Sequence, residues 1–170
     1  MRRRFAAGAL ALALAVKLVA DALPAAVVAG AFQRPAARLA AFYLNAAYDP
    51  AALTVSAHGV TLAVVRACAA TDFFSLVCAL FALALPIRRR TLRLPAALAG
   101  AWLVAVGANA ARLVGLVFAD ACVCASSVPA SSVPAVHMAV GLAVFLPAFA
   151  ALWYTIVVRK EVSRGQHAAD

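Results

Sequence analysis

Residues 88–119 read RRRTLRLPAALAGAWLVAVGANAARLVGLVFA, a triple arginine followed by an almost unbroken run of apolar side chains. A helix needs about 20 mainly apolar residues to cross the ~30 Å hydrocarbon core of a bilayer, and the run from Leu94 to Ala119 exceeds that length. Basic residues beside such a run are typical of the cytoplasmic flank of a spanning helix. We therefore predict that this stretch crosses a membrane, with Arg88 to Arg93 on the cytoplasmic side.

The composition of the chain supports the same class. Of the 170 residues, 67% are hydrophobic and only 12% are charged, and the mean hydropathy is +0.99. A soluble domain has about a quarter of its residues charged, because its surface faces water. A chain this short cannot bury so much apolar surface in its own core, so lipid must cover the rest. The sequence predicts an all-α membrane protein whose 170 residues form a single domain.

About four spanning helices are predicted, at residues 5–31, 71–87, 94–119 and 136–158. Three basic clusters flank them, Arg2 to Arg4, Arg88 to Arg93 and Arg159 to Arg164. Because an even number of crossings joins each cluster to the next, the positive-inside rule places all three clusters and both termini in the cytoplasm. The net charge of +9 is thus explained by membrane anchors rather than by a nucleic-acid-binding face, and no nucleic acid is expected as a partner.

The first predicted span carries Lys17 and Asp21, whose i,i+4 spacing allows the two charges to pair on one helix face. A cleavable signal peptide is the competing interpretation, since Arg2 to Arg4 precede an apolar stretch with small residues near Asp21. Lys17 in the middle of the run and the long apolar continuation favour a retained helix.

Two outer segments follow from this topology. In the first, Ala36 to Tyr48 is predicted to be an amphipathic helix in the outer leaflet. The alternation and β-branched content of residues 53–65 predict a short hairpin around His58-Gly59. The second segment, Asp120 to Ala135, is rich in Ser and Pro and is predicted to be a loop that contains Cys122 and Cys124.

Three reactive side chains fall at one predicted membrane depth. Cys68 lies just before the second span, Arg112 near the outer end of the third, and His137 at the start of the fourth. A thiol, an imidazole and a guanidinium are the parts that nucleophilic acyl transfer needs. Each residue also has a structural interpretation: packing for Cys68, snorkelling to the interface for Arg112 and an interfacial position for His137.

The sequence around these residues resembles the exosortase/archaeosortase family of multi-pass membrane transpeptidases. The matching elements are Cys68 entering a span, Asn109-Ala110-Ala111-Arg112 near the outer end of the next, and His137-x-x-x-Gly141-x-x-x-Phe145 opening the one after. The order of these three elements and their predicted side of the membrane agree with the family pattern over roughly residues 55–150. The short chain resembles compact members such as exosortase K. At the cysteine the chain departs from the family pattern, because Arg66 replaces an acidic residue and Ala69-Ala70 replace a small polar residue and Gly.

The resemblance implies a cysteine protease and transpeptidase that cleaves the C-terminal sorting signals of secreted proteins. Cys68 would form the thioester, His137 would protonate the leaving amine and activate the acceptor, and Arg112 would stabilise the charged intermediate. Asn109 lies on nearly the same helix face as Arg112 and is expected to orient it. The implied partners are the sorting-signal helix and an acceptor on a membrane lipid or surface polymer. No metal or organic cofactor is expected.

Two other functions remain open from the residues alone. The pair Cys122 and Cys124, in an oxidising compartment, would suit a membrane thiol–disulfide oxidoreductase. Against it, Cys-x-Cys is an uncommon redox pair and the chain has no second vicinal pair. The third possibility is a non-catalytic membrane scaffold, in which Arg112 and His137 would be packing or interfacial residues. Cys78 lies inside an apolar run and is interpreted as inert packing.

Overall fold

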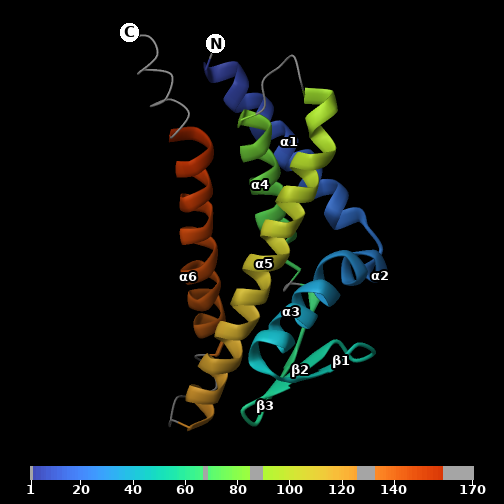
Figure 1. Ribbon diagram of the computed structural model, residues 1–170, viewed down its shortest axis with the longest axis vertical. Helices are drawn as coiled ribbons and strands as arrows, with labels where there is room; N and C mark the ends of the chain where they lie inside the picture. The colour runs from blue at the N-terminus through green and yellow to red at the C-terminus, as the bar shows by residue number, and fades with distance from the viewer. Residues whose placement is uncertain (1, 67–68, 85–89, 126–132, 159–170) are drawn as a thin grey trace.

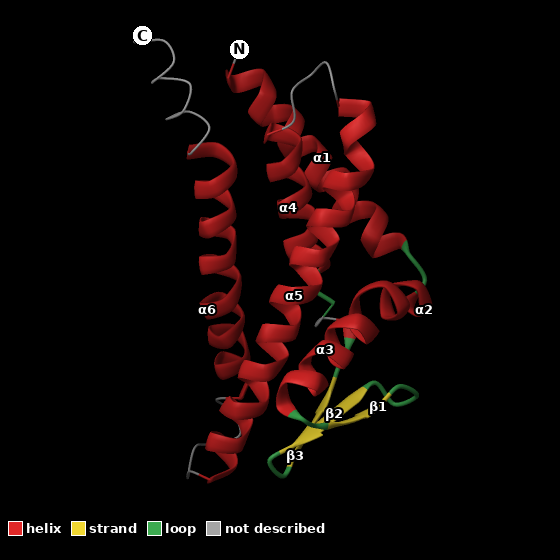
Figure 2. Cartoon of the chain, in the orientation of Figure 1, coloured by secondary structure: helices red, strands yellow, loops and turns green. Residues whose placement is uncertain are grey.

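The computed structural model describes residues 2–66, 69–84, 90–125 and 133–158, a largely helical bundle with a small sheet at one end (Figures 1 and 2). The helices are α1 (Arg2–Ala22), α2 (Ala25–Val28), α3 (Arg34–Leu44), α4 (Thr71–Ala84), α5 (Arg90–Ala125) and α6 (Val133–Trp153), with π-helical turns η1 (Ala29–Gln33) and η5 (Tyr154–Val158). The strands are β1 (Ala47–Asp49), β2 (Thr54–Ala57) and β3 (Val60–Ala63). The beginning of α1 and the end of α6 lie at the same end of the bundle (Figure 1).

Two of the described helices are long and apolar enough to cross a membrane, Leu94–Val123 in α5 and Val133–Ile156 in α6 and η5. They correspond to the third and fourth predicted spans. With 36 residues, α5 is about 54 Å long at 1.5 Å per residue. That length exceeds the ~30 Å hydrocarbon core, so part of α5 extends beyond it. The membrane assignment is therefore supported by these two helices.

The structure departs from the first predicted span at Pro24. Helix α1 ends at Ala22, and the apolar segments Leu10–Ala22 and Ala25–Leu44 meet at 114°. Proline lacks an amide hydrogen and disfavours a helical conformation in the residue before it, so the chain turns there. If this bent pair counts as one broken span, the described residues hold three candidate spans. The apolar helix Thr71–Ala82 is shorter than a span, and the count of four is not confirmed.

The predicted hairpin is confirmed. Strands β2 and β3 pair antiparallel around His58 and Gly59, whose φ angles of 52° and 77° are the positive values that a two-residue hairpin turn requires. The prediction of an all-α fold is corrected by the three-stranded antiparallel sheet, in which β1 also pairs with β2. The predicted amphipathic helix is present as α3 but ends at Leu44, because Asn45 adopts a left-handed conformation and reverses the chain. Tyr48 consequently lies in β1.

The segment after Ala119 also differs from its prediction. Residues Asp120 to Ala125 continue α5 instead of forming a loop, and α6 begins at Val133. The residues between these two helices lie outside the part of the chain that the structure describes, as do Arg88, Arg89 and the cluster from Arg159 to Arg164. Helix α5 thus carries Asp120 and Cys122 on a rigid element rather than on a loop.

Helix α5 is the element that joins the two main hydrophobic clusters. In the first, buried alanines of α3 bring that helix and the sheet against Leu113, Leu116 and Val117. In the second, Ala101 and Ala105 pack against Phe73 of α4. Because α5 contributes to both clusters, it holds the layer of α3 and the sheet in a fixed position relative to α4.

Glycines bring α5 and α6 close together. A Cβ atom added at Gly115 would lie 2.9 Å from Cγ1 of Val140, and one added at Gly141 would lie 3.2 Å from Nε of Arg112. Small residues at such crossings let helix backbones approach closely inside a membrane. The two contacts set the antiparallel register in which α6 faces α5.

Replacing Gly115 by alanine is expected to lower the thermal stability of the detergent-solubilised protein, since the β-branched Val140 cannot move away without shifting α6. Gly107→Ala is the matched control, because a Cβ there meets nothing within 4 Å. That substitution should be neutral or raise stability by up to about 1 kcal/mol through helix propensity. Equal melting temperatures for the two variants would contradict the close α5–α6 contact.

Candidate functional site

A cavity of about 670 Å³ lies between α1, α4, α5 and α6. Its polar lining residues come from α1, α4, α5 and the segment before α4: Lys17, Asp21, Arg66, Thr71, Asp72 and Arg112. The rest of its wall is apolar and is formed mainly by Phe73, Leu76 and leucine and phenylalanine side chains of α6. The cavity therefore combines a charged region on α1 and α4 with an apolar wall on α6.

Arg112 lines this cavity and packs against α6. Its guanidinium carbon lies 5.9 Å from the centre of the Phe145 ring, and Gly141 leaves room for its side chain. Its Nε is buried without a hydrogen-bond partner, and no carboxylate pairs with the guanidinium among the described residues. A cation in apolar surroundings is stabilised by an anionic partner. Arg112 thus packs against α6 at the wall of the cavity, without an ion-pair partner among the described residues.

His137 pairs with Asp120, an acidic residue outside the predicted set of site residues. Its Nε2 lies 3.1 and 3.2 Å from the two carboxylate oxygens of Asp120. His137 is one helical turn before Gly141, so it and Arg112 lie along the same α5–α6 interface, although His137 does not line the cavity. The sequence predicts a loop at Asp120. A prediction that the helix continues beyond Ala119 would have placed Asp120 on α5, facing α6.

Cys68 falls within residues 67–68, outside the part of the chain that the structure describes. The neighbouring residues Arg66 and Ala70 both line the cavity that contains Arg112. Of the three predicted site residues, the structure thus places Arg112 and His137 on one helix pair. The arrangement of Cys68 relative to them stays a prediction.

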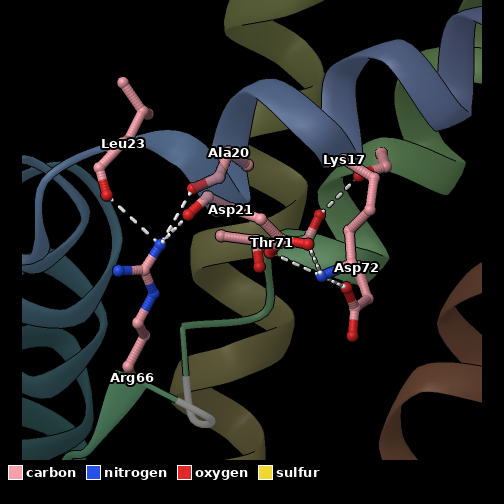
Figure 3. Close-up of polar contacts among 8 residues, drawn as sticks. Lys17, Ala20, Asp21, Leu23, Arg66, Thr71 and Asp72 are labelled. Carbon is pink, nitrogen blue, oxygen red and sulfur yellow. Dashed lines mark hydrogen bonds and ion pairs between the residues drawn. The ribbon is translucent and has the colours of Figure 1, made fainter.

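Charged residues join α1 to α4 beside the cavity. Lys17 Nζ lies 2.6 Å from Oδ1 of Asp21 and 2.8 Å from Oδ1 of Asp72, as Figure 3 shows. The first pair confirms the i,i+4 prediction, and the second links the two helices. Asp72 was not anticipated, because its contact with Lys17 depends on the antiparallel packing of α1 and α4.

Arg66 anchors the chain just before the Cys68 segment. Its Nη2 donates to the carbonyl oxygens of Ala20, Asp21 and Leu23 at 3.2, 2.7 and 3.2 Å (Figure 3). The last carbonyls of a helix have no partner within the helix and carry its negative dipole end, which a guanidinium satisfies. The arginine that departs from the exosortase pattern therefore has a structural role here.

The positions of the other cysteines bear on the alternative redox function. Cys122 lies in α5 and is free and exposed, and Cys124 is two positions further along the same helix. Positions two apart on an α-helix do not share a face, which weighs against the redox alternative. Cys78 is free and buried, in agreement with its interpretation as packing. Asn109 is also buried, and its expected influence on Arg112 stays a prediction.

Comparison of the chain with models of protein families, with curated proteins and with solved structures gives no match in any of the three. The function is therefore argued from the cavity, the residues around it and the motifs.

Arg66→Ala is expected to destabilise the protein by about 1 kcal/mol, because its hydrogen bonds are charge-assisted but its guanidinium is exposed to water. The measurement is thermal unfolding in detergent. Arg38→Ala is the control, because Arg38 is exposed on α3 and makes no described polar contact. If the two variants unfold at the same temperature, Arg66 does not stabilise the end of α1.

Proposed function

We propose that this protein is a membrane-embedded cysteine protease and transpeptidase of the exosortase kind. It would cleave the C-terminal sorting signals of secreted proteins at the outer face of the cell inner membrane and transfer them to a lipid or surface polymer. One observation carries the proposal. Arg112, a cation without an ion-pair partner among the described residues, lines the same cavity as Arg66 and Ala70, the residues that bracket Cys68.

The cavity suits a peptide that emerges from a membrane-spanning segment. Its volume of about 670 Å³ is within the range of roughly 300–1,000 Å³ typical of ligand pockets. Leu142 and Leu146 line it and are also largely exposed on α6. An apolar signal helix approaching through the lipid would contact these leucines, while its scissile segment reaches the polar residues.

The first half of the reaction forms a thioester. His137 takes the proton of the Cys68 thiol, and the thiolate attacks the scissile carbonyl carbon. The guanidinium of Arg112 stabilises the negative charge that develops on the carbonyl oxygen. The carbon–nitrogen bond then breaks, and His137 returns the proton to the leaving amine. Since α4 begins at Thr71, three positions after Cys68, the positive end of its dipole also favours the thiolate.

The second half transfers the acyl group. An amine or similar nucleophile on the acceptor gives its proton to His137 and attacks the thioester carbonyl. The carbon–sulfur bond breaks, and Cys68 recovers its proton from His137. The products are the anchored protein, the released signal fragment with its new amino terminus, and the regenerated enzyme, so the cycle is redox-neutral.

The test is processing of a tagged secreted protein that ends in an apolar helix and a basic tail, co-expressed with the enzyme. Cys68→Ala should abolish processing, because it removes the thiol on which the proposed thioester forms. Arg112→Gln should slow it by about 10²–10³-fold, the loss typical of removing one oxyanion donor. Cys122→Ser with Cys124→Ser is the matched control and should process normally. Processing at the normal rate by Cys68→Ala would refute the proposal.

A further inference from the structure

The contact between Asp120 and His137 has no role in the reaction steps described above. Because His137 is the proposed acid–base residue, this contact can influence proton transfer. Both oxygens of the carboxylate lie within hydrogen-bond distance of a single ring nitrogen, at 3.1 and 3.2 Å from Nε2. The side chains are partly buried, with 18% of Asp120 and 31% of His137 exposed. Partial burial shields the pair from water and strengthens it relative to a surface pair.

The two residues are held by rigid elements. Asp120 lies in the continuous helix α5, and His137 lies in the first two turns of α6. The close approach of Gly115 to Val140 and of Gly141 to Arg112 fixes the register of these helices on one side of the pair. A group held in this way is suited to setting the orientation of an imidazole.

The hydrogen bond to Asp120 determines which nitrogen of the His137 ring carries the hydrogen and which carries the lone pair. An ionised carboxylate only accepts hydrogen bonds, so Nε2 must carry the hydrogen in this contact. In the neutral imidazole the lone pair then resides on Nδ1.

We propose that Asp120 is a positioning residue that holds His137 as the Nε2–H tautomer and leaves Nδ1 as the nitrogen that exchanges protons. This inference rests on the proposed function and deepens it. In the thioester-forming step, Nδ1 accepts the thiol proton and the carboxylate stabilises the resulting imidazolium. The same nitrogen then delivers that proton to the leaving amine.

The first test reads the tautomer directly and is independent of activity. Histidine ¹⁵N shifts are recorded for the detergent-solubilised protein at a pH where the ring is neutral, and His137 is assigned by the signals lost in His137→Gln. Wild-type protein should show the Nε2–H tautomer at His137, and Asp120→Asn should show a mixture, because an amide can either accept from or donate to Nε2. The Nδ1–H tautomer in the wild type would overturn the inference.

The second test measures transfer kinetics. Asp120→Asn should lower kcat by about 10²–10⁴-fold with KM changed little, within the range that general acid–base catalysis contributes. Asp120→Glu should recover part of the loss, which a purely structural role would not explain. Asp49→Asn, the same chemical change in strand β1 and away from the cavity lining, is the control and should retain normal kcat. An unchanged kcat in Asp120→Asn, with Cys68→Ala inactive, would refute the positioning role alone, whereas an active Cys68→Ala would refute the proposed function.

Discussion

The close packing of α5 against α6 is the constraint on which the candidate site depends. Without a side chain at Gly141, the guanidinium of Arg112 can lie between the two helices beside Phe145. The same register brings His137 to Asp120. Since α5 also contributes to the core clusters with α3, the sheet and α4, any shift of this helix would move the cavity wall as well. Helix α5 therefore both forms the hydrophobic core and carries residues of the candidate site.

The sequence predicted the features that depend on local pattern. Apolar runs anticipated α5 and α6, and the His58-Gly59 turn with its flanking alternation anticipated the hairpin. Hydropathy averaged over a window could not register Pro24, so the bend after α1 was missed. The Ser- and Pro-rich composition after residue 125 obscured the helical continuation through Asp120. The three residues of β1 form a strand only because β2 lies beside them, which no local pattern could indicate.

Of the candidate site, too, the sequence predicts only the part that depends on residue types and local motifs. Residue types and motif order singled out Arg112 and His137, and the structure places both along one helix interface. The contacts that complete the arrangement are between elements: Lys17 with Asp72, Arg66 with the end of α1, and Asp120 with His137. Each depends on how helices pack, and a single sequence contains that information only indirectly.

The proposed reaction requires that Cys68 carries the acyl group. Mass spectrometry of the wild-type enzyme, quenched in acid during turnover and digested, measures this most directly. We expect a substrate-derived acyl adduct on the peptide that contains Cys68, and hydroxylamine should release it, as it releases a thioester. An adduct on Cys122 instead, or turnover with no adduct on any cysteine, would contradict it.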